Sequence, residues 1–422
     1  MSTAAAAPVA VPAPTWWRRP GLDVVDGALS VNGADLEALA RANGTPLFVY
    51  DLARPAENLR ALRDALDRAG LRHTVRFALK ASPDPAILAV IRGLGAPGTT
   101  GAVGIDACSP GEVLHALANG WEAGEISHTG TNVSERDLDV LLAHPIRINL
   151  DAVSQVERVG RRAPGRTIGI RVNPGAGAGY TDALAYAGDR PTKFGVTADR
   201  LDDAIDAARR HSLVVDTMHF HAGSGWLGDQ LDGFERALAR ATTLLDRLLE
   251  AGCPIREVNV GGGLGRRARD DEQPVDLDAY ASVVARHLEP YDVTAEFEPG
   301  DLVMKDAGVL LGEVVTVEDR AGTRFIGLDI GWNVSCSYFI YRYAQEILPV
   351  RGPLRERTQQ VTIAGHINEA GDLFAEDYPF ADVAEGDVVA ILNQGGYEQA
   401  MSMTHCLRPM AGAIHLERER DA

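Results

Sequence analysis

Residues 76–82 read Arg-Phe-Ala-Leu-Lys-Ala-Ser, an apolar run that predicts a buried β-strand ending on the amine of Lys80. The chain has only three lysines, at positions 80, 193 and 305, because arginine supplies almost all of its positive charge. A lysine that is desolvated at the end of a strand can lose its proton and attack a carbonyl group, whereas an arginine stays charged. The alternative is an ordinary lysine whose stem lies along the strand end while its charge reaches solvent. The residues that follow in the chain favour the first interpretation.

Short apolar strands alternate with amphipathic helices on the C-terminal side of this stretch. Strands are predicted to start near residues 74, 104, 125, 147, 167, 214, 257 and 293. Helical patterns lie between them, for example at 111–120, 136–143, 200–210, 234–251 and 277–288. Eight such units over about 230 residues are typical of a (β/α)₈ barrel. An open doubly wound sheet is the alternative, and the lack of a Gly-x-Gly-x-x-Gly motif after an early strand counts against it.

The alternation of strands and helices ends at residue 309. Short β-like runs are predicted at 309–317, 323–329, 361–363, 388–392 and 413–416. Near the N-terminus, residues 22–31 predict a hairpin that turns at Asp26-Gly27, and residues 46–50 predict another strand. We therefore expect an α/β protein with a second, all-β domain. The predicted segments are a disordered tail at 1–21, N-terminal strands of the β-domain at 22–50, the barrel at 51–308 and the C-terminal β-domain at 309–422.

The composition narrows the class of protein. A chain of 422 residues that is 45% hydrophobic can bury a large core. A net charge of −18 argues against nucleic acid or an anionic membrane as a partner, and no apolar stretch approaches the ~20 residues of a membrane helix. No basic segment precedes the apolar residues of Met1 to Pro14, so we expect no signal peptide. The four cysteines match no metal spacing or disulfide framework, which predicts a cytoplasmic protein without a metal.

Polar residues close the predicted strands of the barrel, where the functional site of a (β/α)₈ barrel lies. Taken singly, each has an ordinary explanation: glycines can form a turn, a histidine can be a satisfied core residue, and a glutamate before proline can be a solvated loop acid. Their joint occurrence at corresponding strand ends predicts one site. The candidates are Lys80; Asp106; Thr129 to Asn132; Arg171; His219, His221 and Ser224; Gly261 to Gly263; and Glu298 to Gly300.

These groups match the needs of one cofactor, pyridoxal 5′-phosphate (PLP). Its aldehyde needs a lysine such as Lys80 for a Schiff base, and its ring nitrogen needs an acid such as Glu298 to keep it protonated. Its phosphate needs backbone donors, which the glycine loop at 261–265 can supply. Arg171, near the end of the fifth strand, can orient the ring. We therefore predict a PLP site at the mouth of the barrel.

Several ordered motifs resemble those of a known family. They are residues 77–81, 106–112, 220–225, 261–263, 298–300 and 395–397, followed by Met401-Ser402 and Arg408-Pro409. The chain resembles the PLP-dependent amino-acid decarboxylases of the alanine-racemase fold (fold type III), the group of diaminopimelate and ornithine decarboxylases, over about residues 22–417. The resemblance implies a (β/α)₈ barrel with a C-terminal β-domain. It also implies a homodimer in which the partner subunit completes each active site.

The resemblance implies a role for each matching residue. Lys80 would form the Schiff base, and His221 would stack on the pyridine ring while Ser224 helps to hold the cofactor. Glu298 would bind the ring nitrogen and Tyr397 would reach the phosphate. The full set of cofactor-binding candidates is Lys80, Asp106, Arg171, His221, Ser224, Gly261, Gly262, Gly263, Glu298, Gly300 and Tyr397.

The chain departs from the family pattern where substrate binds. Asp301 stands where diaminopimelate decarboxylases have an arginine, and Ser337 stands at the place of a second substrate-binding arginine, although Tyr341 remains. The catalytic Cys-Glu-x-x-Asp motif reads Asn368-Glu369-Ala370-Gly371-Asp372. A carboxamide cannot supply the proton that the cysteine thiol supplies, so His366 is the first candidate donor, followed by Cys336 and water. The substrate-binding candidates are Asp301, Ser337, Tyr341, Glu369 and Asp372, with Asn368 orienting the substrate.

The preferred hypothesis is a decarboxylase that acts on an amino acid with a cationic or neutral side chain, and not on diaminopimelate itself, because an anion beside Asp301 is repelled. A racemase or epimerase is an alternative, although racemases of this fold place an arginine at the ring nitrogen instead of a glutamate such as Glu298. Decarboxylation coupled to formation of a new bond is another. A non-catalytic PLP-binding relative is less favoured, since Lys80, His221 and Tyr397 are retained.

Overall fold

The structure, a computed structural model, describes residues 12–95, 99, 101–185 and 192–418. The described residues fall into two units. The barrel unit comprises Pro55–Arg266 and Gln273–Val303. The β unit takes its residues from Met1–Arg54, Arg267–Glu272 and Met304–Ala422. No helix in the described part of the chain is both long enough and apolar enough to span a bilayer.

The barrel unit contains a closed barrel of parallel strands in the order β10-β11-β12-β5-β6-β7-β8-β9. The strands are β5 (His73–Ala78), β6 (Gly104–Ala107), β7 (Ile126–Gly130), β8 (Arg147–Leu150), β9 (Thr167–Arg171), β10 (Val214–His219), β11 (Glu257–Asn259) and β12 (Thr294–Phe297). Each begins within one residue of its predicted start. The barrel closes where β12 pairs with β5, with Ala295 opposite His73. The (β/α)₈ prediction is therefore confirmed.

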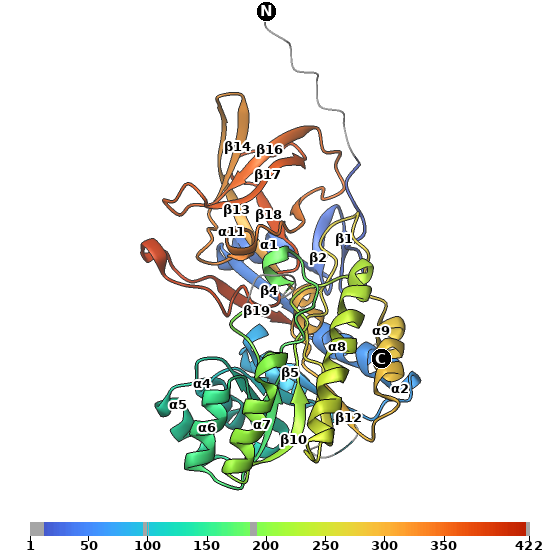
Figure 1. The fold of residues 1–422 in the computed structure, drawn as a ribbon. Coiled ribbons are helices and arrows are strands. Elements are labelled where there is room, and N and C mark those ends of the chain that lie inside the picture. The colour runs from blue at the N-terminus through green and yellow to red at the C-terminus, as the bar shows by residue number, and fades with distance from the viewer. Residues whose placement is uncertain (1–11, 96–98, 100, 186–191, 419–422) are drawn as a thin grey trace, which may run out of the picture. The chain divides into compact units, whose positions relative to one another are not determined.

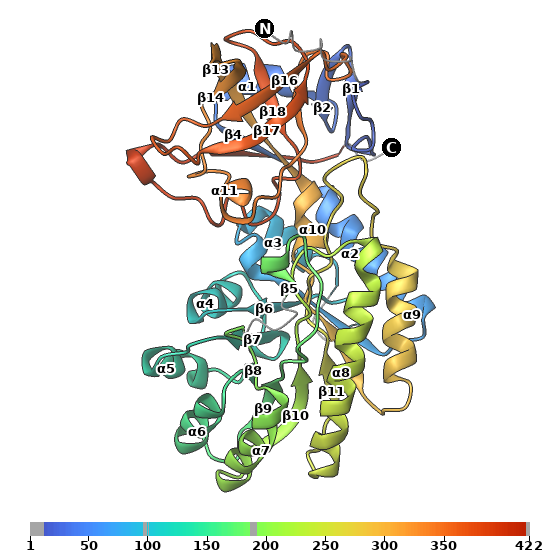
Figure 2. The ribbon, with the colours of Figure 1, turned by 45° about the horizontal axis from the view of Figure 1, so that its top comes forward.

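Helices lie on the outside of this barrel (Figures 1 and 2). Each of them buries an apolar face. They are α2 (Ala53–Arg68), α3 (Pro85–Arg92), α4 (Pro110–Ala118), α5 (Glu135–Ala143), α6 (Val153–Arg162), α7 (Leu201–Arg210), α8 (Leu231–Glu250) and α9 (Leu277–Leu288). Their starts are set locally: the side chains of Asp84, Ser109 and Ser134 accept backbone N–H groups at the first turns of α3, α4 and α5. Because these helices begin a few residues after β5, β6 and β7, the loops that join strand to helix at the barrel mouth are short.

The β unit is built on a sheet with the strand order β15-β18-β13-β14-β16-β17, which β4 joins by pairing with β13 and β19. These strands are β4 (Leu47–Asp51), β13 (Gly308–Arg320), β14 (Thr323–Leu328), β15 (Ile347–Pro349), β16 (Gln359–Ala364), β17 (Leu373–Phe380), β18 (Val388–Ile391) and β19 (Gly412–Leu416). Because β4 lies between β13 and β19, residues 47–51 near the N-terminus are part of this sheet. Strands β15 and β17 were not predicted.

A small sheet of β1 (Leu22–Val25), β2 (Ala28–Val31) and β3 (Ala34–Asp35) precedes α1 (Leu36–Asn43). The β1–β2 hairpin turns at Asp26-Gly27, where both residues have positive φ. Of the predicted tail, residues 1–11 lie outside the described residues. Trp17 is only 2% exposed and packs in the core with Leu22 and Leu29, so ordered structure begins before residue 22.

The sequence predicted a barrel at 51–308, whereas the barrel unit begins at Pro55 and ends at Val303. One segment assigned to the barrel, Arg267–Glu272, belongs to the β unit. Two contacts hold it there: Asn393 Nδ2 donates to the carbonyl of Arg267 at 2.8 Å, and the Tyr343 hydroxyl donates to Glu272 Oε2 at 3.1 Å. Local sequence pattern could not reveal these contacts, because each joins residues far apart in the chain.

Candidate active site at the mouth of the barrel

The barrel brings most of the predicted cofactor residues to one rim. Parallel strands of a closed barrel end at the same side, so the residues that close them become neighbours. The register places Ala78, two residues before Lys80, opposite Asp106, and His219 opposite both Arg171 and Asn259. The residues at this rim are Lys80 after β5, Asp106 in β6, Arg171 at the end of β9, His219 at the end of β10, Asn259 at the end of β11 and Glu298 after β12.

Lys80 lies on a short 3₁₀ turn, Leu79–Ala81, that directly follows β5. Leu79 and Ala81 are buried, whereas Lys80 is exposed. The expectation of a desolvated amine is therefore wrong for this structure, because the turn carries the side chain out of the buried strand. The amine remains part of the site, since its charge acts on the pKa values of Asp106 and Glu298. Lys80 is thus accessible to a ligand that enters the mouth.

Glu298 is a buried carboxylate held at both oxygens. Asn259 Nδ2 donates to Oε1 at 2.6 Å, and His219 Nε2 lies 3.0 Å from Oε2. Burial and the neighbouring Glu296 raise the pKa of Glu298 to about 7, against the opposing effects of the Asn259 hydrogen bond and the Lys80 charge. Glu298 can therefore exchange a proton near neutral pH, which suits a group that holds the proton of a ring nitrogen.

The two histidines at the end of β10 are neutral. Burial, together with the charges of Arg171 and Lys80, holds the pKa of both imidazoles well below the usual value. A carboxylate accepts, so His219 Nε2 carries the hydrogen and donates it to Glu298. His221 Nδ1 accepts the amide N–H of Gly262 at 3.3 Å, and its Nε2 lies 3.5 Å from Ser224 Oγ. His221 thus presents an uncharged ring of fixed orientation.

The glycine loop packs too closely for any side chain. A Cβ at Gly262 would lie 2.1 Å from the carbonyl O of Glu298, and one at Gly263 would lie 2.1 Å from that of Gly223. Two of the three amides have internal partners, because Gly261 N–H donates to Asn259 Oδ1 and Gly262 N–H to His221. Among the described residues, the Gly263 amide has no such partner. The loop therefore offers fewer amides to a phosphate than the sequence suggested.

Asp106 and Arg171 complete the rim. Asp106 is 3% exposed, and its Oδ1 has no hydrogen-bond partner among the described residues. Burial and the nearby Glu298 raise its pKa well above the ordinary value. Arg171 is 8% exposed, and its Cζ lies 4.6 Å from the ring centroid of Phe194. An unsatisfied buried carboxyl at a strand end is a feature of a site that receives a polar ligand.

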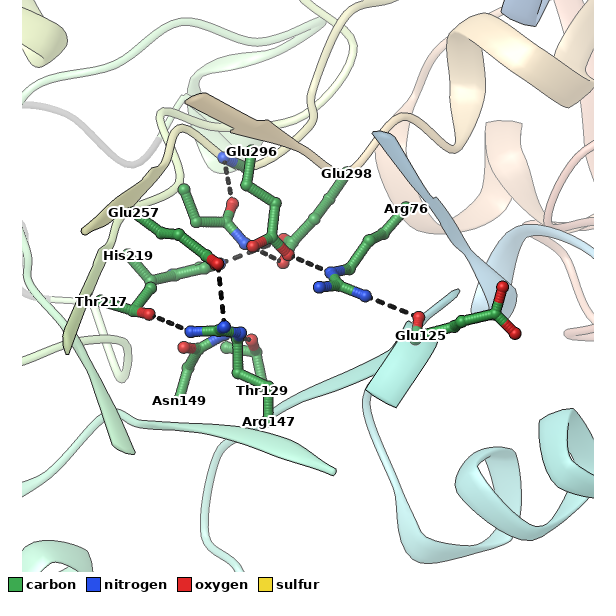
Figure 3. A network of polar contacts seen from close by, with 12 residues as sticks. Arg76, Glu125, Thr129, Arg147, Asn149, Thr217, His219, Glu257, Glu296 and Glu298 are labelled. Atoms are coloured by element: carbon green, nitrogen blue, oxygen red, sulfur yellow. Dashed lines mark hydrogen bonds and ion pairs between the residues drawn. The ribbon is translucent and has the colours of Figure 1, made fainter. Parts of the chain in front are cut away.

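Charged residues also lie in the interior of the barrel (Figure 3). Arg76 Nε lies 2.5 Å from Glu296 Oε1, and Arg76 Nη1 donates to the carbonyl of Glu125 at 2.6 Å. Arg147 pairs with Glu257 at 2.9 Å. The sequence analysis named His219 as a candidate without a specific role, and it did not identify Glu296 or Asn259. A signal for Glu296 was available, because residues two apart on a strand share a face, so residues 296 and 298 both point inward.

Asp301 is buried in the barrel unit at the start of α10 (Asp301–Met304). The β unit contains the predicted residues Ser337, Tyr341, His366, Asn368, Glu369, Asp372 and Tyr397. Ser337 begins α11 (Ser337–Tyr341), and its hydroxyl donates to Glu398, a carboxylate that is 1% exposed. The backbone N–H of Cys336 donates to the other oxygen of Glu398 at 2.8 Å. The sequence interpretation missed Glu398, which directly follows Tyr397. Tyr397 itself has a positive φ of 70°.

The loop of residues 365–372 is held by Asp372. This residue is 3% exposed, and its oxygens accept the backbone N–H groups of Trp332 at 2.7 Å and Ile367 at 2.6 Å. One oxygen therefore holds the loop at Ile367 and the other holds Trp332, and a contact of Asp372 with substrate stays a prediction. Asn368 and Glu369 on the same loop are exposed.

His366 on this loop is half-buried. Burial and the charge of Arg408 lower its pKa, and its Nε2 has no hydrogen-bond partner among the described residues. Cys336 is more deeply buried, which raises the pKa of its thiol to about 12. At neutral pH the imidazole of His366 is therefore uncharged and the thiol keeps its proton.

Comparison with known proteins identifies the family. Residues 53–305 match a family described as "Pyridoxal-dependent decarboxylase, pyridoxal binding domain". The chain belongs to this family. The decarboxylase is 34% identical to diaminopimelate decarboxylase of Methanothermobacter thermautotrophicus, with 95% of each chain covered, and 32% identical to that of Pseudomonas aeruginosa, with 94% and 93% covered.

Solved structures share the fold of this decarboxylase. The crystal structure of AQ1208 from Aquifex aeolicus has a TM-score of 0.82 at 27% identity, covering 94% of this chain and 93% of that one. The diaminopimelate decarboxylase of M. jannaschii has a TM-score of 0.83 at 24% identity, covering 94% and 93%. The barrel and the β unit together are therefore those of the PLP-dependent decarboxylases.

The residues at the rim fit the PLP cofactor of this family. Lys80 offers an accessible amine, and Glu298 offers a buried carboxyl that titrates near neutral pH. The unsatisfied side-chain oxygen of Asp106 is a polar group available to a ligand. The tight glycine loop leaves its backbone uncovered by side chains. The decarboxylase is thus a PLP-dependent carboxy-lyase whose barrel carries the chemical groups that the cofactor needs.

Proposed function

We propose that this decarboxylase removes the α-carboxylate of an amino acid whose side chain is cationic or neutral. The supporting observation is the Ser337–Glu398 hydrogen bond. Ser337 occupies the place that the family resemblance assigns to an anion-binding arginine, and here it is bound to a carboxylate instead. A substrate with a distal carboxylate would find a serine hydroxyl bound to the buried carboxyl group of Glu398 there, in place of the positive charge of an arginine. In the barrel unit, Asp301 stands in place of the other family arginine, so a positive charge is replaced by an acidic residue there as well.

The residues at the rim have distinct roles in this proposal. When bound, PLP supplies the electron sink for the pair of electrons that departing CO₂ leaves behind. Lys80 attaches the cofactor through its amine, and Glu298 holds a proton at the ring nitrogen. The neutral ring of His221 packs on the cofactor face. Arg171 orients the ring, and Ser224, Gly263 and Tyr397 contact the phosphate.

The proton delivered to the α-carbon must come from a group other than Asn368, because a carboxamide is not an acid at neutral pH. The lowered pKa of His366 leaves little imidazolium to donate, whereas the Cys336 thiol is protonated. His366, Cys336 and water remain the candidates, with Asn368 and Glu369 orienting the substrate. A slow proton delivery would favour decarboxylation coupled to formation of a new bond, which is the second candidate reaction. A racemase is disfavoured by Glu298, which stands where racemases of this fold have an arginine.

The names of the curated relatives favour a second candidate substrate, meso-diaminopimelate, because they are diaminopimelate decarboxylases at up to 34% identity. We propose further that the enzyme is a cytoplasmic homodimer with shared active sites. The family resemblance implies such a dimer, and Tyr397 and residues 366–372 lie far along the chain from Lys80. Neither proposal changes the reaction type.

The test is CO₂ release from a panel of amino acids that includes lysine, ornithine, arginine, neutral amino acids and meso-diaminopimelate. We expect turnover of a cationic or neutral member and at least tenfold lower kcat/KM for meso-diaminopimelate. Lys80→Ala should abolish turnover and the visible absorption of the attached cofactor, whereas Lys193→Ala, the matched lysine control, should keep both. Preferred turnover of meso-diaminopimelate would refute the substrate proposal. No release from any amino acid would favour a non-catalytic relative.

A further inference from the structure

Asn259 lies at the end of β11 with its side chain completely buried between two parts of the site. Its Nδ2 donates to Glu298 Oε1 at 2.6 Å, and its Oδ1 accepts the amide N–H of Gly261 at 2.8 Å. One partner is an acceptor and the other is a donor, so the carboxamide has a single possible orientation. The same side chain therefore joins the acid to the glycine loop.

The backbone closes this connection into a ring of hydrogen bonds. The amide N–H of Glu298 donates to the carbonyl of Gly261 at 2.8 Å. Glu298 thus contacts the loop both through its own backbone and through the side chain of Asn259. A shift of the carboxylate relative to the loop would have to break at least one of these buried hydrogen bonds, and a buried donor left without a partner is costly.

We propose that Asn259 is a positioning residue, which fixes the carboxylate of Glu298 and the glycine loop as one rigid unit so that both ends of the cofactor are held in register. This inference rests on the proposed role of Glu298 at the ring nitrogen. It assigns a task to a residue that has no contact with the reacting atoms. His219 supports the same carboxylate from its other oxygen.

The electrostatics agree with this geometry. Glu298 is buried and lies near the charge of Glu296, and both effects favour its neutral form. Two N–H donors, from Asn259 and His219, favour the ionised form instead. Without them, Glu298 would keep its proton to higher pH and would bind a protonated ring nitrogen less strongly.

Asn259→Asp separates the two contacts. The new side chain can still accept from Gly261 N–H, but it places a second carboxyl oxygen beside Glu298 where a donor had been. Two adjacent carboxylates share a proton, so the apparent pKa of the pair should rise by about one unit or more. The readout is a pH titration, on the holoenzyme without substrate, of the protonated-carboxyl infrared band that Glu298→Gln removes. PLP release after dilution should stay within about twofold of wild type, because the loop contact remains.

Asn259→Leu removes both contacts. It should raise the pKa of Glu298, and it should release PLP at least tenfold faster than the wild type. The matched control is Asn149→Leu in β8, because Asn149 is also buried in the barrel interior but donates to Thr129 Oγ1 instead of Glu298. This control should leave both the carboxyl titration and PLP release unchanged even if it lowers the melting temperature. At the other oxygen, His219→Gln should preserve the titration, since an amide can donate, and His219→Leu should shift it upward.

An unshifted titration in Asn259→Asp would overturn the proposal. So would Asn149→Leu changing the titration and PLP release as much as Asn259→Leu does, because the effect would then be a general loss of barrel stability. No substrate is present in these experiments. An error in the proposed substrate class would therefore leave their results unchanged.

Discussion

Replacing Arg76 by methionine should open the barrel where β5 meets β12. Arg76 is the first residue of the stretch that carries Lys80, and it pairs with Glu296 in the barrel interior (Figure 3). The two side chains are only 7% and 0% exposed. The methionine fills much of the space of the arginine stem but leaves the carboxylate of Glu296 buried without this partner. Removing one member of a buried ion pair costs about 3–5 kcal/mol.

The penalty should depend on pH. Burial favours the neutral form of Glu296, but the charges of Arg76 and Arg147 outweigh it and hold the pKa of Glu296 below its ordinary value. In the wild type this contribution to stability is present above the unfolded pKa, about 4.3, and is lost as the pH falls through the folded pKa. In Arg76→Met the pKa of Glu296 should rise instead. The penalty should therefore be largest near pH 8 and shrink toward pH 5 as Glu296 takes up a proton.

The assay is native-state hydrogen exchange, read by mass spectrometry on peptides that cover β5 and β12, because it reports local opening in a chain with two units. A loss of 3–5 kcal/mol corresponds to exchange faster by about two to nearly four powers of ten. Arg72→Met is the matched control, since Arg72 pairs with Asp292 at 2.5 Å but with exposures of 62% and 95%. It should change exchange by about fivefold at most.

The double variant Arg76→Met with Glu296→Gln tests the cause. Removing the stranded charge should recover part of the protection that Arg76→Met loses, and the difference between the variants measures the coupling. Equal effects of Arg76→Met and Arg72→Met, or a penalty that does not change between pH 8 and pH 5, would refute the reasoning.

Four further predictions concern the reaction. Glu298→Gln should retain PLP, measured by absorbance, yet lower kcat by at least about tenfold, since a carboxamide cannot hold the ring proton in the same way; unchanged kcat would remove Glu298 from that role. Asp301→Arg should move the kcat/KM ratio toward substrates with a distal carboxylate, and an unaltered ratio would place Asp301 outside the pocket. In D₂O the product should carry one deuterium on the former α-carbon, and Asn368→Cys should speed that protonation step in single-turnover kinetics; a product without deuterium would instead indicate coupled bond formation. Mixing inactive Lys80→Ala and Tyr397→Phe chains should restore part of the CO₂ release if subunits share their sites, whereas a fully active monomer in light scattering would contradict this.

The barrel could be predicted because its signals are local. Each strand is a short apolar run and each helix a pattern of period 3.6, so the strand starts were placed to within one residue. The turn at Asp26-Gly27 was likewise visible, since both residues tolerate positive φ. Strands β15 and β17 gave weaker signals, because a strand in an antiparallel sheet owes its stability to neighbours that are distant in the chain.

The candidate site could likewise be predicted in part. The sequence alone determined which residue types close the strands, and the order of Lys80, His221, the glycine loop and Glu298 was enough to indicate PLP. It could not assign partners: Arg76 and Glu296 are 220 positions apart, and Ser337 and Glu398 are 61 apart. Only the closure of β12 against β5 and the packing of the β unit bring such pairs together.

Exposure was likewise decided only by the tertiary structure. Lys80 is exposed although the strand before it is buried. Asp372 is buried although Asn368 and Glu369 on the same loop are exposed. The physical reason is that burial, and with it pKa and hydrogen bonding, depends on which distant segments cover a residue. The sequence determined the chemical groups of the site, and the closed barrel decided that Asn259 and His219 hold Glu298.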